Sequence, residues 1–580
     1  MKILKILVSV CFPFAFLAFS LTVAGNTIHF GDETAYLQTD RNVYIAGENI
    51  FYKLYLIDSC THKLSGISRI AYLVLRNDSN IPIAKIKINA NGGSAYGSIF
   101  LPDSLKSGTY QIVVFTNWMR NAGEESFFAK EIFIANRFDN DLALLNTFNG
   151  FGNKGHDSIL QKPVVNAPLL VKTNKSQYLK REKISLSLAF PEGILADTAN
   201  LSISVTEDIP GRGNDFSTEN NSWRNAGNSK RRLSEKNKFL PEQKGEIIQG
   251  RVINRDSGKA VAGTNVFLSA ADSLVNLQYY VTDSTGMFRF LLNDYYYGKD
   301  LYFNIKDIPV GRQSEIIPED KFELKNTFVS SQHPDNQLLK EYVLKSQDIV
   351  TIQKTYEVKT VSEMRKKVNS NFSCPQLFYK PNYRISPADF VPLDDFAEMA
   401  KEIIPPQLNL RKHNDMYTAT MADENLHLYM DEEPVVFLDG VLINDVNQLQ
   451  RLGSKEVKHI ELVCTRFNCG ELIFPGILAV FSKNEEIRNI RFNSPSLHTQ
   501  LETFHPCSIY INQSYAQEIP GNHPDFRQLL YWNPDVEVSA SHNPLIEFYA
   551  SDYSGNYTIR IEGVTSGGVP VSISTSINVK

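Results

Sequence analysis

The chain has 580 residues, of which 42% are hydrophobic and 21% charged, and its formal net charge is −5. Because domains usually hold about 100–200 residues, this length predicts several of them. Acidic and basic residues are interspersed without a basic stripe along the chain. The composition therefore disfavours nucleic acid as a partner.

The first residues predict export. Lys2 and Lys5 precede an apolar run from Ile6 to Ala24, and polar residues follow it. A positive start, an apolar run and small residues at its end are typical of a signal peptide, which we place at residues 1–24. The alternative is a membrane anchor, because a run of about 20 apolar residues could just span a bilayer.

Residues 27–137 read as short alternating strands. Ile86 and Ile88 share one face of the stretch 81–89, and Lys85 and Lys87 share the other. This period of two is typical of a half-buried antiparallel sheet. Glycine-containing turns recur at short intervals, as a β-sandwich of about 100 residues requires.

A short motif occurs twice. Thr39-Asp-Arg-Asn-Val-Tyr44, followed by Glu48, recurs as Thr173-Asn-Lys-Ser-Gln-Tyr178, followed by Glu182. Two copies of one sandwich module are the simplest explanation. We therefore predict a linker over 138–165 and a second, partial sandwich over 166–210 that later strands could complete.

These residues carry a family resemblance. The stretch Tyr36-Leu-Gln-Thr-Asp-Arg-Asn-Val-Tyr-Ile-Ala-Gly-Glu48, together with Thr116-Asn-Trp-Met-Arg120, resembles macroglobulin-type domains of Bacteroidetes envelope proteins. The resemblance implies an immunoglobulin-like sandwich. It does not extend to the thioester of protease-trapping macroglobulins, because Cys469-Gly-Glu-Leu472 has Leu where the chemistry needs Gln.

The middle of the chain changes character. Residues 211–245 are rich in Asn, Ser, Lys and Arg and predict a flexible polar loop. Residues 246–325 alternate again, with turns at Asp256-Ser-Gly258 and Asp283-Ser-Thr-Gly286, where glycine can adopt positive φ. This part resembles the carboxypeptidase-regulatory-like domain, another β-sandwich, and 326–389 reads as a connecting segment.

Residues 390–485 combine a helix with strands. Asp394 or Asp395 caps a short amphipathic helix, in which Phe396 and Met399 lie on one face. Strands are expected at 433–443, with a turn at Asp439-Gly440, and then at 455–463 and 475–483. This order resembles the plug domain of TonB-dependent outer-membrane receptors. Only 97 residues follow Lys483, whereas a 22-stranded barrel at about 10 residues per strand needs well over 200.

The plug resemblance implies candidate site residues. Leu438, Asp439, Gly440 and Glu461 are the candidate partner-docking residues. Cys464 and Cys469 could form a disulfide in an oxidising compartment or could be two buried thiols. The run Tyr295-Tyr-Tyr297 could be an exposed anchor for a partner or ordinary strand packing.

No pattern of catalytic chemistry stands out. None of the eleven histidines belongs to a His-Glu-x-x-His motif, and neither a nucleophile elbow nor a phosphate-binding glycine loop is present. We expect no catalytic residues, no metal, no cofactor, no small-molecule substrate and no enzyme activity.

The expected fold class is mainly β and multidomain, with immunoglobulin-like β-sandwiches in tandem and one small α/β plug-like domain. Residues 486–580 alternate again and predict a C-terminal β domain, or strands that complete an earlier sandwich. The leading hypothesis is an exported adaptor, periplasmic or on the cell surface, that docks with an outer-membrane β-barrel protein or TonB-dependent transporter complex for transport or protein assembly. The alternative is a cell-surface binding module for host protein or glycan.

Overall fold

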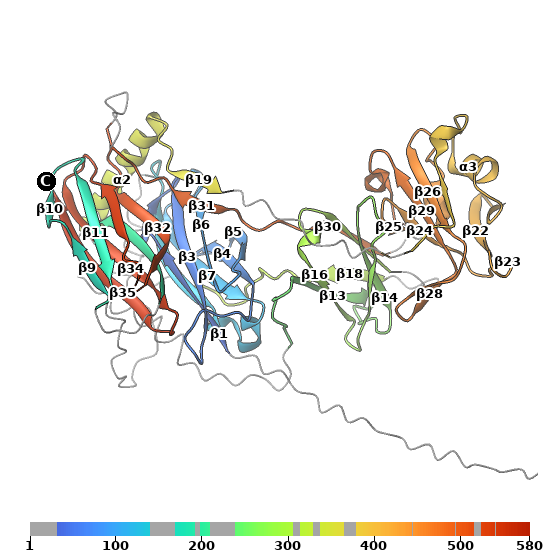
Figure 1. Ribbon diagram of the computed structural model, residues 1–580, viewed down its shortest axis with the longest axis horizontal. Helices are drawn as coiled ribbons and strands as arrows, with labels where there is room; N and C mark the ends of the chain where they lie inside the picture. The colour runs from blue at the N-terminus through green and yellow to red at the C-terminus, as the bar shows by residue number, and fades with distance from the viewer. Residues whose placement is uncertain are drawn as a thin grey trace, which may run out of the picture.

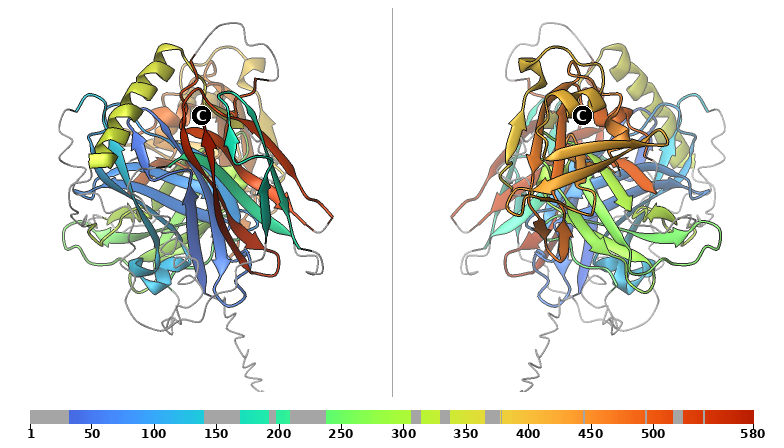
Figure 2. Two further views of the ribbon diagram at one scale, coloured as in Figure 1. Left: turned by 90° about the vertical axis from the view of Figure 1, so that its left-hand side faces the viewer. Right: turned by 90° about the vertical axis from the view of Figure 1, so that its right-hand side faces the viewer.

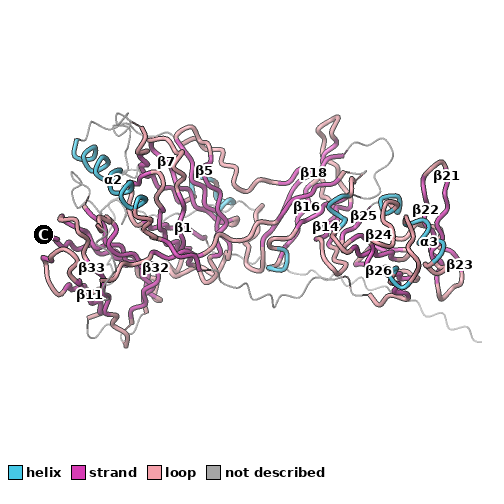
Figure 3. The backbone as a smooth tube through the Cα atoms, turned by 90° about the horizontal axis from the view of Figure 1, so that it is seen from above, coloured by secondary structure: helices cyan, strands magenta, loops and turns pink. Residues whose placement is uncertain are grey.

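The computed structural model describes residues 32–139, 169–191, 198–208, 238–305, 314–328, 337–364, 377, 379–443, 445–492, 495–515, 524–539 and 541–580. The expected signal peptide lies outside these residues, as do most of the predicted linker and polar loop. The protein is mainly β and multidomain, and it has two lobes along one long axis (Figure 1, Figure 3).

The first sandwich packs two sheets face to face. Their strand orders are β1-β3-β6 and β2-β8-β7-β4-β5, with β2 and β8 parallel. Two short 3₁₀ helices, η1 (Met119–Ala122) and η2 (Glu124–Ser126), precede the last strand. The strands are β1 (Glu33–Thr39), β2 (Val43–Ile45), β3 (Asn49–Asp58), β4 (Ile70–Asn77), β5 (Pro82–Asn89), β6 (Ser94–Phe100), β7 (Gly108–Thr116) and β8 (Phe128–Ala135).

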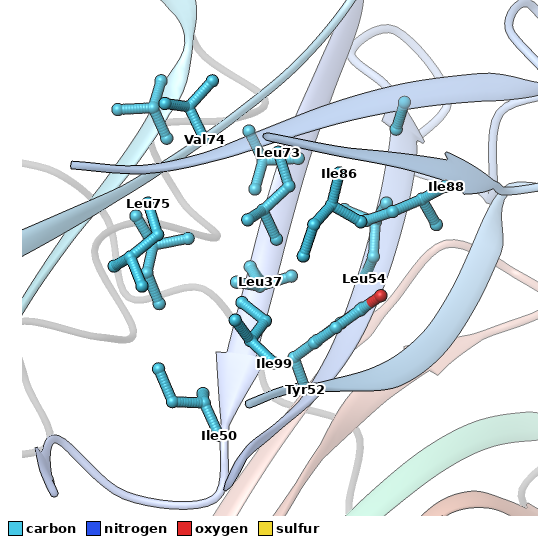
Figure 4. Close-up of a cluster of buried hydrophobic side chains, with 14 of the residues drawn as sticks. Leu37, Ile50, Tyr52, Leu54, Leu73, Val74, Leu75, Ile86, Ile88 and Ile99 are labelled. Carbon is cyan, nitrogen blue, oxygen red and sulfur yellow. The ribbon is translucent and has the colours of Figure 1, made fainter. Parts of the chain in front are cut away.

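The core of this sandwich lies between its two sheets. Leu54, Leu73 and Ile86 point into the same space (Figure 4), and each is at least nine-tenths buried. Successive residues of a strand face opposite sides, so alternation delivers these side chains inward. Each fully buried Leu or Ile contributes about 1.5–3 kcal/mol.

The second sandwich repeats this strand order with other parts of the chain. Its sheets are β9-β11-β33 and β10-β35-β34-β12-β32, with β10 and β35 parallel. Strand by strand this matches the first sandwich. The strands are β9 (Leu170–Thr173), β10 (Gln177–Tyr178), β11 (Lys183–Ala189), β12 (Ala199–Glu207), β32 (Leu529–Val538), β33 (Leu545–Tyr549), β34 (Gly555–Thr565) and β35 (Pro570–Val579).

The two sandwiches differ at one connection. In the first, β4 turns directly into β5 through residues 78–81, whereas in the second the equivalent strands β12 and β32 are separated by residues 208–528. The third sandwich, the α/β domain and the helix α2 (Gln337–Thr355) are thus all inserted into one hairpin. Hairpin tips tolerate insertions because the strand ends already lie close together.

The duplicated motif has one hydrogen-bond pattern in both copies. The Tyr44 hydroxyl lies 2.8 Å from the Asp40 carboxylate, and the Tyr178 hydroxyl lies 2.7 Å from the Asn174 side-chain oxygen. Both tyrosines are buried. Burial raises the pKa of Asp40 to about 6, although Arg41 beside it acts to lower that pKa.

The glutamates of the motif are equivalent too. The Glu48 carboxylate accepts a hydrogen bond from the backbone N–H of Ile45 at 2.7 Å, and Glu182 accepts one from Leu179 at 2.7 Å. Each carboxylate also pairs with the cation of its own copy. The repeat in the sequence therefore records a shared turn structure.

The third sandwich lies in the other lobe. Its sheets are β16-β13-β18 and β15-β14-β17-β30. Gly258 and Gly286 adopt φ of 65° and 73° in their turns, as predicted. The elements are β13 (Glu246–Asn254), β14 (Asn265–Ala270), β15 (Gln278–Val281), β16 (Met287–Leu292), η4 (Asp294–Tyr296), β17 (Asp300–Ile305), β18 (Ser314–Pro318) and β30 (Ser496–Gln500).

The α/β domain forms the far end of that lobe (Figure 1). Its main sheet has the order β20-β26-β29-β24-β25, and smaller sheets join β21-β22-β23 and β27-β28. The helix α3 begins where predicted, because the Asp395 carboxylate accepts a hydrogen bond from the backbone N–H of Glu398 at 2.8 Å. The elements are β20 (Tyr383–Ile385), η5 (Pro387–Asp389), α3 (Phe396–Glu402), β21 (Leu408–His413), β22 (Met416–Asp423), β23 (Leu428–Tyr429), β24 (Val435–Leu438), β25 (Val441–Ile443), η6 (Val446–Leu449), β26 (Val457–Val463), β27 (Phe467–Cys469), β28 (Leu472–Phe474), β29 (Ile477–Ser482) and η7 (Glu486–Asn489).

A long helix packs on the first sandwich. The helix α2 lies against the outside of this sandwich (Figure 2). Its side chains Tyr342, Val343 and Val350 share a buried cluster with Val43 and Phe133. The strand β19 (Val361–Met364) follows it and pairs with β31 (Cys507–Tyr510). Residues 326–389, expected as a connection, thus supply a helix and two strands.

The C-terminal segment does not form a domain of its own. Residues 486–580 were expected as a C-terminal β domain or as strands that complete an earlier sandwich, and in the structure their strands are divided among other parts. The strand β30 joins the third sandwich, β31 pairs with β19, and β32 to β35 complete the second sandwich. Single strands of this tail alternate normally, so their sequence alone does not reveal which sheet they join.

Buried charges join the first sandwich to the base of the third. Lys87 pairs with Glu246 at 2.6 Å, and Lys321 pairs with Glu242 at 2.6 Å. The Tyr72 hydroxyl donates to Glu242 at 2.8 Å. Burial raises the pKa of Glu242 even with Lys321 beside it. Removing one member of such a network leaves an uncompensated buried charge, which costs about 3–5 kcal/mol.

Candidate interaction site

The predicted docking turn is an internal feature of the protein. Asp439 and Gly440 form the turn between β24 and β25 with φ of 49° and 78°. The Asp439 carboxylate accepts hydrogen bonds from the backbone N–H and hydroxyl of Ser482, at 2.6 and 2.7 Å, and from the backbone N–H of Ile487 at 3.2 Å. Leu438 is fully buried. The carboxylate therefore organises its own domain.

The same turn packs against the third sandwich. The backbone N–H of Asp272 donates to the Asp439 carbonyl at 2.9 Å. A Cβ at Gly440 would lie 2.5 Å from the Leu274 carbonyl, so glycine is needed both for its φ and for this close approach. The chain itself therefore covers Leu438, Asp439 and Gly440, the residues predicted to dock a partner, and the structure leaves them no open surface.

The sheet face beneath this turn is covered as well. Phe437 and Ala479 share a buried cluster with Phe267 and Val275 of the third sandwich. The Asn304 side chain donates to the Leu442 carbonyl at 2.8 Å. The α/β domain and the third sandwich thus form one packed unit.

Glu461, the fourth predicted docking residue, is also engaged within its domain. Its carboxylate accepts a hydrogen bond from the Tyr379 hydroxyl at 2.8 Å and lies 3.6 Å from His459. The interaction with nearby His459, and then the hydrogen bond from Tyr379, lower the pKa of Glu461. His459 in turn stacks on Phe481, with ring centroids 4.5 Å apart. Glu461 is a structural acceptor on the sheet.

The two cysteines of this domain are free thiols. Cys464 lies in the core on the α3 side of the sheet, whereas Cys469 packs at the cluster shared with the third sandwich. Of the two alternatives, the structure therefore has the thiols. Burial raises the pKa of Cys464 to about 12, which keeps it protonated and unreactive near neutral pH.

The tyrosine run is packed rather than exposed. Tyr296 is fully buried, the Tyr295 hydroxyl donates to the Asp272 carboxylate, and Tyr297 packs on Phe504 with ring centroids 4.6 Å apart. These contacts fix the base of the third sandwich. The run therefore provides packing rather than an anchor for a partner.

Apolar side chains are exposed at a hairpin that the sequence reasoning missed. Leu426, Leu428 and Tyr429, in the turn between β22 and β23 and on β23 itself, are 67%, 68% and 49% exposed. This hairpin, which we call the apolar tip, lies at the far end of the lobe (Figure 1). Single exposed apolar residues are ordinary, but several on one short hairpin are typical of interaction surfaces. The signal in the sequence is the leucine pair flanking His427 in a polar turn.

A groove lies beside the cluster that this domain shares with the third sandwich. It has a volume of about 540 Å³ and is lined by Phe267, Leu442, Ile473 and two acidic residues, Glu432 and Glu433.

Within the described part of the chain, no group of three or more His, Cys, Asp or Glu side chains is placed to hold a metal ion. Among the described helices, none has the length and apolarity to cross a bilayer.

Comparison with known proteins yields a structural likeness only. No family model and no curated protein matches the chain. Similar solved structures include Salmonella α2-macroglobulin reacted with methylamine (8% identity, TM-score 0.24, covering 94% of this chain and 39% of that one). Trypsin-activated α2-macroglobulin from Escherichia coli is another (10% identity, TM-score 0.23, 94% and 41%).

The chain thus spans 39–41% of the length of those bacterial macroglobulins. TM-scores this low carry no argument about relationship or activity. The fold rests instead on the strand pairing described above.

Proposed function

We propose that the protein is a non-enzymatic adaptor at the outer membrane, which docks through the apolar tip with a β-barrel membrane protein complex for transport or protein assembly. The observation that carries this proposal is the apolar tip itself, with Leu426 and Leu428 each about two-thirds exposed. Burying such residues in a partner gains about 25 cal/mol per Å² of apolar surface.

The architecture supports a spacing role. The third sandwich and the α/β domain share a buried cluster, and ion pairs fix their base to the first sandwich. The apolar tip is therefore held at a set distance from the paired sandwiches. Rigid presentation lowers the entropy lost on binding.

The resemblances in the sequence support the cellular compartment that we propose. The α/β domain resembles receptor plug domains, and the first sandwich resembles macroglobulin-type envelope domains. Together with the signal-like first residues, they favour an exported, outer-membrane-associated protein on the periplasmic or cell-surface side.

The test uses in-cell crosslinking of the tagged full-length chain, detergent solubilisation of the outer membrane and identification of the captured proteins. We expect a β-barrel protein, and its loss in the double variant L426S/L428S. The matched control is L170S/L179S on the second sandwich, where the wild-type side chains are 47% and 66% exposed.

Two outcomes would count against the adaptor. One is capture of no barrel protein by the wild type. The other is equal capture by L426S/L428S, especially with loss in L170S/L179S, which would favour the surface-binding module that uses the sandwiches.

A further inference from the structure

The groove between the third sandwich and the α/β domain has an apolar floor. Phe267 of β14, Val435 of β24, Leu442 of β25 and Phe474 of β28 line it, and all four belong to the cluster that joins the two domains. Its volume of about 540 Å³ is within the range of ligand sites. The packing of two domains therefore fixes the floor of this groove.

The short strand β28 contributes one wall, and its position is fixed on both sides. At the turn before it, the backbone N–H of Glu471 donates to the Tyr279 hydroxyl of the third sandwich at 2.9 Å. After it, the backbone N–H of Val435 donates to the Gly476 carbonyl at 3.0 Å. A wall held in this way loses little conformational freedom when a ligand binds.

This wall presents an apolar side chain to solvent. Ile473 lies in the middle of β28, lines the groove and is 59% exposed. Among the described strands β28 pairs only with β27, so one of its edges has no strand partner. Extended peptides add to such edges and place side chains in neighbouring pockets. The wall therefore suits an extended peptide.

The charges of the groove all have one sign. Glu432 and Glu433 line it and are exposed, and none of the described residues that line it is basic. Asp431 and Glu471, next to the lining in sequence, are exposed acidic residues as well. Complementary charge speeds association and selects the partner. Acidic residues beside an apolar floor therefore favour a partner in which basic and apolar residues are neighbours.

We propose that this groove binds an extended segment of another protein in which basic and apolar residues are neighbours. The apolar side chains pack over Phe267 and Ile473, and the basic side chains pair with Glu432 and Glu433. The residues of this groove are not those of the apolar tip, so this site does not require the adaptor role.

The test measures binding of three fluorescent pentapeptides to the full-length chain by anisotropy. The probes, each with blocked ends, are Val-Lys-Val-Lys-Val, Val-Glu-Val-Glu-Val and Ser-Lys-Ser-Lys-Ser. We expect the first to bind at least tenfold more tightly than either of the others. The difference between the first two should shrink in about 0.5 M salt, because salt screens exposed charges.

Two pairs of variants locate the binding. E432Q/E433Q should weaken binding of Val-Lys-Val-Lys-Val at least fivefold, whereas E502Q/E537Q, which removes the same charge from exposed positions elsewhere, should change it less than twofold. I473S should also weaken it at least fivefold. Its matched control is I81S beside β5, where the wild-type side chain is 57% exposed.

Several results would overturn the proposal. They are equal binding of the first peptide and either of the others, or no binding of the first at millimolar concentration. Unchanged binding in E432Q/E433Q or I473S, or equal losses in a variant and its control, would do the same. Crosslinking to a barrel protein is measured separately, so failure of this site leaves the test of the adaptor intact.

Discussion

The two paired sandwiches have the same strand order and the same turn motif, but only the first is continuous in sequence. The second interrupts the hairpin equivalent to β4–β5 with residues 208–528, and that insertion carries the third sandwich and the α/β domain, which together we call the arm. The ion pairs at the base of the third sandwich nevertheless go to the first sandwich. The arm is connected through the chain to the second sandwich, but its base packs against the first sandwich.

The difference shows how little a fold depends on chain continuity. In the second sandwich Ala199 pairs with Thr565 in adjacent strands, so its core requires contacts across most of the sequence. The entropy cost of closing a loop grows only with the logarithm of its length, so the insertion is thermodynamically tolerable. Non-local contacts do slow folding, so we expect the second sandwich to form after the first.

The largest expected effect comes from truncation before Leu529. The second sandwich would lose four of its eight strands and expose core residues such as Leu201 and Ile203. We expect hydrogen exchange to show loss of protection over residues 170–207, with protection retained over 33–135. Equal loss in both regions would mean that the first sandwich depends on the second.

The next test compares two lysines on one strand. Lys87 and Lys85 both pair with a carboxylate, but the Lys87–Glu246 pair is buried, whereas Lys85 and Asp320 are 40% and 50% exposed. We expect K87M to lower the free energy of unfolding by about 3–5 kcal/mol. K85M should cost about 1 kcal/mol or less. Denaturant midpoints measure both, and similar losses would show that the buried network does not fix the arm.

The two copies of the motif should differ in their response to pH. Asp40 has a folded-state pKa of about 6 against an ordinary 3.8, whereas the second copy has Asn174 in its place. Between about pH 4 and 6 the folded protein holds a proton that the unfolded chain has released, so this group makes stability fall as pH rises.

D40N should remove that part of the pH dependence, at most about 3 kcal/mol over the window. Asn174 shows that an amide can serve here, because its side-chain oxygen accepts hydrogen bonds from Tyr178 and from the backbone N–H of Ser185. Melting temperatures of wild type and D40N measured from pH 4 to 7 provide the comparison. Parallel curves would contradict the raised pKa.

The smallest expected effect compares the two motif tyrosines. Y44F removes a hydrogen bond to a carboxylate, worth about 1.5–3 kcal/mol, whereas Y178F removes one to an amide, worth about 1 kcal/mol. Urea unfolding followed by hydrogen exchange can assign each loss to its own sandwich. A larger loss in Y178F would reverse the ranking of the two turns.

Local features could be read from the sequence. Alternation placed Ile86 and Ile88 in the core, Asp395 capped its helix, and Gly258 and Gly286 took the positive φ of their turns. These features depend on a few neighbouring residues. The local pattern therefore contains the information that decides them.

Features that depend on distant packing could not be read in this way. Lys87 looked solvent-exposed because its strand alternates, yet the third sandwich buries it. Leu438 and Gly440 looked like a docking turn until the position of residues 270–274 was known. The helix α2 did leave a signal, because Tyr342, Val343 and Val350 recur at helical spacing, but the segment was treated as a connection.

The route of the chain at the base of the arm has a mechanical consequence. The two ends of the insertion leave neighbouring strands, β12 and β32, at the same hairpin end, so a pull on the arm alone would unzip that pair one rung at a time. Arg69 Nη2 lies 2.7 Å from both carboxylate oxygens of Asp294. This ion pair connects the arm to the first sandwich, so part of the force would act on that sandwich. A force applied at the far end of the arm would therefore act on the first sandwich, which is continuous in sequence.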